Sequence, residues 1–458
     1  MIVAVAAFAR HQWPSRFGGL RRLAWPASLL ALFAGAFLLY AFIGPGQSDT
    51  DGWFPLATAM LHGHLWIDGS RPWIELVPAG NGQYYLPFPP IPAVVLMPIV
   101  AIFGEGISDT NGVSALAGAF DLLLVFAMLR ALRLDRVESM VLTLGFGFGS
   151  EVFYVAATGG VHHWTEMLTV GFILGAMNLA LRGRTPWLAG VLFALAVGCR
   201  PTALLAAPAL VVLYWRAGGW LAGRAESPVS SSDVAEGEET ATAAAARAAI
   251  GSVRSAASGL ARFVREINWP GIMALALGAG LIGIWLAWYN VARFGSPTEF
   301  GYDLIRGQDG SSVLSEAWYK YGIVSPFYLA RGLYSMLLRG WEFNENFPWV
   351  EPSWAGCSVL FTTPILVYLV RCRWRDPLIL AGWLGLVLPV GLDLMHGNPG
   401  YAQFGYRFIL DGLPFAWLLL GLLVARNGLT RGMVLAILVG IEVSLYGMAC
   451  IASGFVTS

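Results

Sequence analysis

The first residues suited to chemistry are two aspartates, Asp49 and Asp51, which follow a long apolar run at about residues 23–43. A carboxylate here can act as a general base, taking the proton of a hydroxyl group as that group forms a new bond. Side chains two positions apart point to opposite sides of an extended strand, and the pair could also hold a divalent cation, the one cofactor that the residues suggest. The alternative is a solvated acidic turn. We expect the catalytic role.

Arg200 is an isolated cation between apolar runs at residues 189–197 and 203–214. An unpaired cation at membrane depth costs about 2.5 kcal/mol or more, so an anionic partner is expected. Phosphate is a suitable partner, because its oxygens match the planar guanidinium group in pairs. The alternative is an ion pair with a buried carboxylate such as Glu151 or Asp393. We predict that Arg200 binds a phosphate.

Arg407 is a second candidate for binding phosphate, preceded by Tyr406 and followed four positions later by Asp411. In an α-helix this spacing brings two side chains together, so Asp411 would orient the Arg407 guanidinium. Gln403 is a supporting residue of the same group. The alternative is an ion pair with a purely structural role.

A polar group also follows two glycines, Gly159 and Gly160, and contains His162, His163 and Glu166. Glycine lets the backbone approach a ligand closely, and a carboxylate in the first turn of a helix is favoured by the helix dipole. We expect these residues to support the site. They could instead be interfacial polar residues, or His162 and Glu166 could form a metal cluster with Asp51.

The elements that position these residues are those of a membrane protein. The chain is 57% hydrophobic and 12% charged, whereas a soluble domain has about 25% charged residues. Apolar runs of membrane-spanning length recur along it. The four cysteines lie in or beside apolar segments without metal-ligand spacing, and we expect no disulfide among them.

The basic residues orient the predicted spans. Twenty of the 28 Lys and Arg residues fall into six short clusters between apolar runs: residues 10–22, 130–136, 182–184, 216–265, 371–375 and 426–431. Basic clusters mark the cytoplasmic side of a membrane protein. This predicts about 11 transmembrane helices, with the N-terminus in the cytoplasm and the C-terminus outside.

The same pattern divides the chain into three parts. Residues 1–216 form an N-terminal membrane module with a long outer segment at 44–111, residues 217–268 a low-complexity cytoplasmic linker, and residues 269–458 a C-terminal membrane module with an outer segment at 293–352. Residues 86–103 are apolar but hold five prolines, which do not suit a helix interior. We interpret them as a re-entrant or interfacial element, the alternative being an ordinary span.

Short motifs follow one another in a set order outside the linker. They read Asp49-Thr50-Asp51-Gly52-Trp53, Tyr84-Tyr85-Leu86-Pro87, Arg293-Phe294-Gly295-Ser296-Pro297, Phe300-Gly301-Tyr302 and Gln403-Phe404-Gly405-Tyr406-Arg407-Phe408. This order resembles bacterial members of the GT-C glycosyltransferases, the group related to protein O-mannosyltransferases and lipid A aminoarabinose transferases.

The resemblance implies an all-α, polytopic helical bundle of the GT-C type, with juxtamembrane helices in the first outer segment. It implies a sugar donor linked to polyprenyl phosphate, whose phosphate is held by basic residues, while an acidic residue of the first outer segment acts near the acceptor. The chain departs from the commoner Asp-Glu pair of the family, with Thr50 after Asp49 and Gly52 after Asp51. Asp51 is slightly favoured as the base, because its spacing to Leu56 and Ala57 fits related chains better.

We therefore expect a glycosyltransferase of the bacterial inner membrane that inverts the sugar in a single displacement on the outer face. Its partners would be the lipid-linked donor, an acceptor that is a glycan, lipid or protein, and membrane lipids, but no nucleic acid. Tyr84, Tyr85 and Tyr302 could stack on sugar rings, although such residues more often form the aromatic belt at a membrane surface. The rival function is a transporter or flippase of lipid-linked saccharides, which needs the arginines but not the aspartates.

Overall fold

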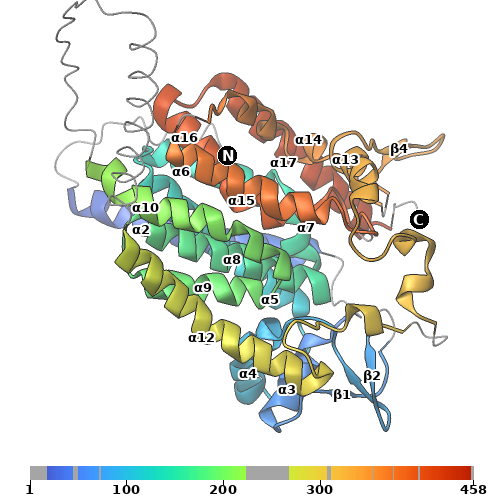
Figure 1. Cartoon of the computed structure of the whole chain (residues 1–458). Helices are drawn as coiled ribbons and strands as arrows, with labels where there is room; N and C mark the ends of the chain where they lie inside the picture. The colour runs from blue at the N-terminus through green and yellow to red at the C-terminus, as the bar shows by residue number, and fades with distance from the viewer. Residues whose placement is uncertain are drawn as a thin grey trace, which may run out of the picture.

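The computed structural model describes residues 18–44, 50–71, 74–222, 268–306, 311–353, 355–374, 376–400 and 403–454. Asp49 and nearly all of the predicted linker therefore lie outside the described residues. The described chain is mainly helical, and its helices form a single bundle with two small β-sheets at one end (Figure 1).

Five helices of the described part are long and apolar enough to cross a membrane. They are α2 (Gly18–Ile43), α5 (Thr110–Ala131), α8 (Val161–Leu181), α12 (Trp269–Phe294) and α17 (Arg431–Ala452). A sixth candidate is a bent pair, α6 (Arg136–Phe148) and α7 (Glu151–Thr158), which meet at 55°. The apolar run at about residues 139–156 predicts one continuous helix. The structure bends it, because the side chain of Ser150 caps a second helix by accepting from the backbone N–H of Val152.

The expected count of about 11 spans is not confirmed. The other apolar segments form shorter helices: α4 (Ile91–Phe103), α9 (Pro186–Val197), α10 (Ala207–Ala222) with the 3₁₀ turn η2 (Pro201–Ala206) before it, α15 (Pro377–Asp393) and α16 (Leu413–Asn427). A span needs about 20 residues. The apolar run that ends at Arg371 predicts one span. It is instead broken into α14 (Val359–Thr362) and the 3₁₀ helix η7 (Pro364–Arg371), because Pro364 interrupts it.

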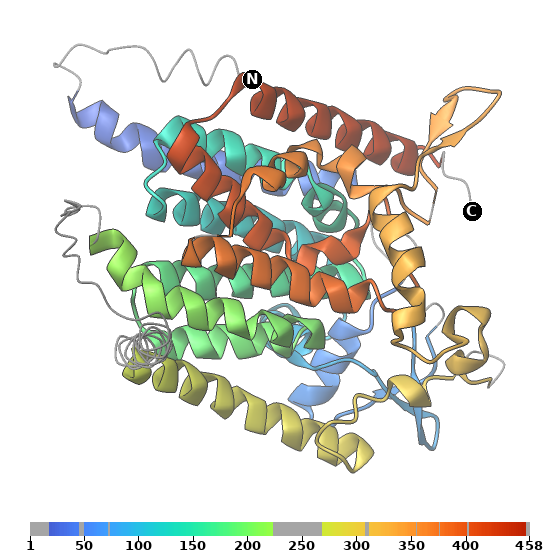
Figure 2. The same cartoon turned by 45° about the horizontal axis from the view of Figure 1, so that its top comes forward.

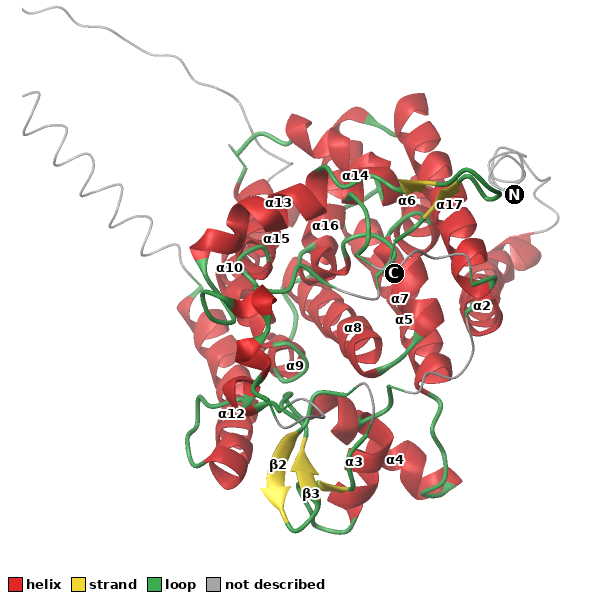
Figure 3. Ribbon diagram, turned by 90° about the vertical axis from the view of Figure 1, so that its right-hand side faces the viewer, coloured by secondary structure: helices red, strands yellow, loops and turns green. Residues whose placement is uncertain are grey.

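The first outer segment forms a small unit beside the bundle (Figure 3). Helix α3 (Trp53–Leu61) packs on α4, next to a three-stranded antiparallel sheet of β1 (Ile67–Asp68), β3 (Gln83–Tyr85) and β2 (Val77–Gly80) in that order. Helix α4 has 13 residues and ends at Gly104, which is too short for a regular span. The apolar core of this unit continues into Val161 and Trp164, so the unit is attached to the start of α8.

The second outer segment covers the same end of the bundle (Figure 2). It runs through four 3₁₀ turns, η3 (Tyr302–Leu304), η4 (Val313–Ser315), η5 (Ala317–Tyr319) and η6 (Pro326–Tyr328), then α13 (Leu329–Leu337), β4 (Glu342–Phe343) and β5 (Val350–Glu351). One backbone bridge joins Leu76 to Arg306, and another joins Val324 to His396. The second outer segment therefore contacts both the first outer segment and the loop after α15.

Close packing of α9 against α12 depends on two glycines. A Cβ atom on Gly278 would lie 1.9 Å from the carbonyl oxygen of Trp187, and one on Gly190 would lie 2.0 Å from that of Leu275. The two backbones therefore touch, and α12 is fixed against the bundle at this point.

Gly278→Ala should lower stability by about 1–3 kcal/mol, because the added methyl group must push the helices apart. Gly283→Ala, on the same helix where a Cβ would meet nothing within 4 Å, should leave stability unchanged or raise it slightly. Thermal unfolding in detergent would compare them. Equal melting temperatures for the two variants would show that α9 and α12 are not in backbone contact.

Candidate functional site

Five charged side chains meet where the helices approach the outer segments. We call them the charge cluster: Glu166 of α8, Arg200 before η2, Asp393 at the end of α15, and Arg407 and Asp411 of the 3₁₀ helix η8 (Arg407–Asp411). All five are nearly buried, the side chain of Arg200 being the most exposed at 14%. The cluster brings together residues from four separate parts of the chain.

Arg200 contacts three carboxylates. Its Nε donates to Oδ1 of Asp411 at 2.7 Å, its Nη1 lies 3.3 Å from Oε1 of Glu166, and its Nη2 lies 3.7 Å from Oδ1 of Asp393. Thr202 donates a further hydrogen bond to Asp411. Arg200 is therefore not a lone cation, and the alternative of an ion pair with Asp393 is confirmed. Glu151, the other carboxylate considered, accepts from Thr362 instead.

Arg407 shares one of these partners. Its Nη1 lies 2.8 Å from Oε1 of Glu166, the same oxygen that faces Arg200. The expected pairing of Arg407 with Asp411 is wrong, since Asp411 accepts from Arg200 and Thr202. The physical reason is the helix type: η8 is a 3₁₀ helix with three residues per turn, which places residues four apart on different faces.

Several polar atoms of this region are buried without a hydrogen-bond partner among the described residues. They are Oε2 of Glu166, Nε of Arg407, Oδ2 of Asp393 and the hydroxyl of Tyr406. Buried polar atoms normally have a hydrogen-bond partner, so an atom without one indicates a place for a water molecule or a ligand. The free Nε of Arg407 can donate to an anion.

Gln403 holds the backbone that carries Arg407. Its side-chain Oε1 accepts from the backbone N–H of Arg407 at 3.2 Å, and its Nε2 donates to the carbonyl groups of Ala355 and Pro399 at 3.1 and 3.2 Å. The aromatic ring of the residue after Arg407, Phe408, packs against both guanidinium groups. Its centroid lies 5.5 Å from Cζ of Arg200 and 5.0 Å from Cζ of Arg407. Gln403 is therefore a supporting residue of the cluster.

The first turn of α8 connects the charge cluster to the first outer segment. Nε2 of His162 lies 3.6 Å from Oε2 of Glu75, and Glu166 follows His162 by one helical turn on the same face. Burial by itself raises the pKa of Glu75, but the charge and hydrogen bond of His162, together with the charge of Arg407, outweigh it, so the pKa lies below the ordinary value. Glu75 is therefore ionised at neutral pH.

Aromatic residues of both outer segments surround this pair. The ring of Phe88 lies 5.4 Å from His162 and 5.9 Å from Tyr302. The ring centroid of His396 lies 5.8 Å from that of Tyr319 and 6.1 Å from that of Phe408. Burial lowers the pKa of His396, and the charges of Arg200 and Arg407 add to this, so its ring is neutral at pH 7.

The other sequence candidates lie outside the cluster. His163 points back toward Thr158 and Gly159, where it braces the turn between α7 and α8. Tyr84 packs on the core of the first outer segment, and Tyr85 lies against Phe294 at 5.6 Å. These three residues have packing or bracing contacts in the structure.

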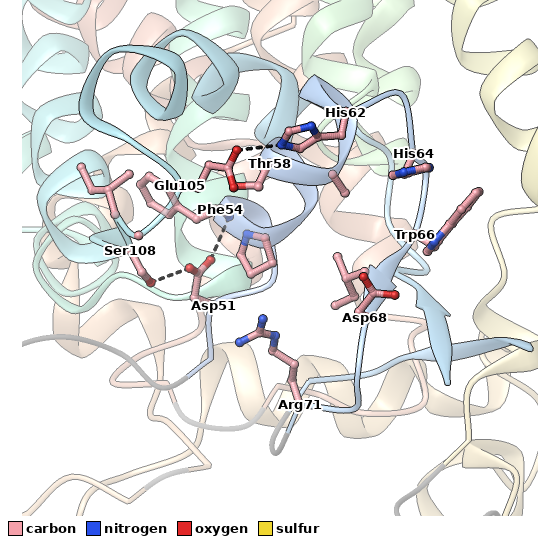
Figure 4. Close-up of a pocket in the computed structure, with 15 residues that line it drawn as sticks. Asp51, Phe54, Thr58, His62, His64, Trp66, Asp68, Arg71, Glu105 and Ser108 are labelled. Carbon is pink, nitrogen blue, oxygen red and sulfur yellow. Dashed lines mark hydrogen bonds and ion pairs between the residues drawn. The ribbon is translucent and has the colours of Figure 1, made fainter. Parts of the chain in front are cut away.

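Asp51 lies in the wall of a separate cavity of about 870 Å³ in the first outer segment (Figure 4). Its Oδ1 accepts from the backbone N–H groups of Trp53 and Phe54 at 3.0 and 3.1 Å, and its Oδ2 accepts from Ser108 at 2.6 Å. Oδ1 therefore caps the start of α3, and Oδ2 connects this start to Ser108 in the loop between α4 and α5. The cavity is also lined by His62, Trp66, Asp68, Arg71 and Glu105.

No three His, Cys, Asp or Glu side chains of the described ranges lie close enough to hold a metal ion. His162, Glu166 and Asp51, the alternative considered from the sequence, therefore do not form a metal cluster. His162 pairs with Glu75, and Glu166 pairs with the arginines. A cation between Asp49 and Asp51 stays a prediction, because Asp49 lies outside the described residues.

Sequence reasoning missed Glu75, His396, Tyr319 and Phe408 as parts of this region. No local pattern marks them: Glu75 stands between apolar residues of an outer segment, and His396 follows a helix end. Asp393 was named only as a possible ion-pair partner. These residues could have been identified only from the contact between the two outer segments near the start of α8.

No protein-family model matches the chain, and no curated protein matches its sequence. Among solved structures, the apo crystal structure of the oligosaccharyltransferase of Archaeoglobus fulgidus matches with a TM-score of 0.42 and 13% sequence identity. The match covers 97% of this chain and 56% of that one, so the chain spans little more than half the length of that structure.

Proposed function

We propose that this chain is a membrane glycosyltransferase that takes a sugar from a polyprenyl-phosphate carrier and transfers it to an acceptor on the outer face of the bacterial inner membrane. The observation that carries the proposal is the pair of nearly buried guanidinium groups, Arg200 and Arg407, which share Oε1 of Glu166 at the end of the bundle where the outer segments meet.

This pair suits a lipid-linked phosphate for two reasons. Guanidinium groups bind phosphate oxygens in pairs, and the Nε of Arg407 has no partner among the described residues. The cluster also lies at the ends of apolar helices, as α8 begins at Val161 and α15 ends at Asp393. A lipid whose tail lies among such helices would bring its phosphate to this level.

The chemistry is a single displacement. The acceptor oxygen forms a bond to the anomeric carbon of the sugar while the bond from that carbon to the phosphate oxygen breaks, and the configuration inverts. The phosphate leaves with added negative charge, which Arg200 and Arg407 stabilise. The hydroxyl proton of the acceptor passes to a carboxylate of the first outer segment. The acceptor would be a glycan, a lipid or a protein.

The test uses the full chain purified in detergent and in liposomes. We expect it to bind undecaprenyl phosphate and to release undecaprenyl phosphate from at least one of a panel of undecaprenyl-phosphate-linked hexoses and pentoses, with the sugar appearing on an acceptor or on water. Movement of the intact sugar lipid across the liposome membrane, with no cleavage, would instead support the transporter.

A further inference from the structure

We infer that Glu75 is the general base that takes the proton of the acceptor, and that His162 positions its carboxylate beside the donor. This inference rests on the proposed function and adds to it the residue that receives the proton. It also differs from the sequence expectation, which favoured Asp51.

The backbone around Glu75 is firmly held while its side chain stays accessible. The neighbours Ile74 and Leu76 are 8% and 5% exposed, and the carbonyl oxygen of Leu76 accepts from the backbone N–H of Arg306 at 3.3 Å. Alternate side chains of an extended stretch point to opposite sides, so Glu75 faces away from this core. Its side chain is 41% exposed, and an acceptor hydroxyl can therefore reach it.

The contacts of His162 place this carboxylate near the donor phosphate. Glu75 lies 3.6 Å from His162, and Glu166, one turn further along α8, contacts Arg407 at 2.8 Å. One turn advances the helix by about 6 Å over four residues. The carboxylate therefore lies about one turn beyond the guanidinium groups toward the outer segments. A sugar attached to a phosphate that Arg407 binds would lie between the guanidinium groups and the Glu75 carboxylate.

Asp51 is less suited to the same step. Asp51 is only 8% exposed, and its carboxylate accepts three hydrogen bonds, two from the start of α3 and one from Ser108. A base must have an oxygen within hydrogen-bond reach of the proton that it takes. Three of the roughly four lone-pair positions of the Asp51 carboxylate are therefore already occupied, whereas Glu75 has His162 as its side-chain partner and a side chain that is 41% exposed.

The charges around Glu75 keep its carboxylate ionised, which is the form that can accept a proton. His162 and Arg407 favour its ionised form. Tyr302 and Tyr319 also lie near Glu75, and burial raises the pKa of each to about 12, so both stay neutral at pH 7. After transfer the proton lies on a carboxylate that is open to water, from which it can exchange.

The experiment compares Glu75→Gln, Asp51→Asn and a matched surface control, Glu342→Gln, whose residue is exposed on β4. Each variant is tested for release of undecaprenyl phosphate from the sugar lipid that the wild type uses. Glu75→Gln should turn over about 10²- to 10⁴-fold more slowly, while its binding of undecaprenyl phosphate stays close to that of the wild type. Glu75→Asp should recover part of the rate, and Glu342→Gln should match the wild type.

A pH profile separates a base from a merely structural residue. Turnover requires ionised Glu75, so activity is lost as the pH falls through its pKa. His162→Gln removes the group that lowers this pKa, so the loss should begin at a higher pH than in the wild type. If Glu75 and His162 had a purely structural role, His162→Gln would lower activity at every pH and would not shift the pH at which activity is lost.

The outcomes separate this inference from the proposed function. Turnover by Glu75→Gln at the wild-type rate, in a protein that transfers sugar, would overturn the role of Glu75 alone, and loss of turnover in Asp51→Asn would then assign the base to Asp51. Loss of undecaprenyl phosphate binding in Glu75→Gln would overturn the inference as well. A wild type that cleaves no sugar lipid of the panel would overturn the proposed function and, with it, this inference.

Discussion

Arg200→Ala is expected to destabilise the folded protein by roughly 3–5 kcal/mol. Among the described residues, Arg200 is the ion-pair partner of both Asp411 and Asp393. It is also one of two arginines that pair with Glu166. Its removal leaves carboxylates that are almost fully buried without a compensating charge. Thermal or chemical unfolding of the purified protein in detergent would measure the loss.

Two further variants make this result interpretable. Arg306→Ala removes an exposed arginine and should change stability little. The double variant Arg200→Met with Asp411→Asn removes a charge of each sign, and it should recover part of the stability lost in Arg200→Ala. If Arg200→Ala were as stable as Arg306→Ala, the charge cluster would not be a buried network.

Arg407→Ala is expected to weaken the binding of undecaprenyl phosphate by roughly 2–5 kcal/mol, which is about 30-fold to several thousand-fold. Arg407 has one described ion-pair partner, Glu166, which keeps Arg200 as a partner when Arg407 is removed. The variant therefore tests the phosphate with less damage to the fold than a change at Arg200. Arg407→Lys keeps the charge but not the planar fork, and it should bind with intermediate affinity.

Glu166→Gln is the matched control for this measurement. It keeps the shape of the side chain and removes the carboxylate that competes with a phosphate for both arginines. Binding should be as strong as in the wild type or stronger. If Arg407→Ala and Glu166→Gln weakened binding to the same extent, the arginine would act only by bracing the bundle.

Long helices were predictable because their causes are local. The continuous apolar runs at about 112–129 and 164–181 each predict one span, and the structure forms α5 and α8 there. Helix α5 begins where the side chain of Asp109 caps it. The predicted number of spans was not confirmed. Hydropathy treats each apolar segment as one helix, but Ser150 and Pro364 each start a new helix inside such a segment.

The sequence by itself determined that this is a chain of apolar helices in which a few charged residues interrupt apolar runs, because an isolated Arg or Glu in such a run is visible in the sequence. It thereby named Arg200, Arg407, Glu166 and Asp411. Only the tertiary structure decided their partners: Arg200 and Asp411 are 211 positions apart, and a 3₁₀ turn keeps Arg407 from Asp411. It also decided that Glu75 meets His162. Such contacts depend on how separate helices and outer segments pack, and no local propensity encodes that packing.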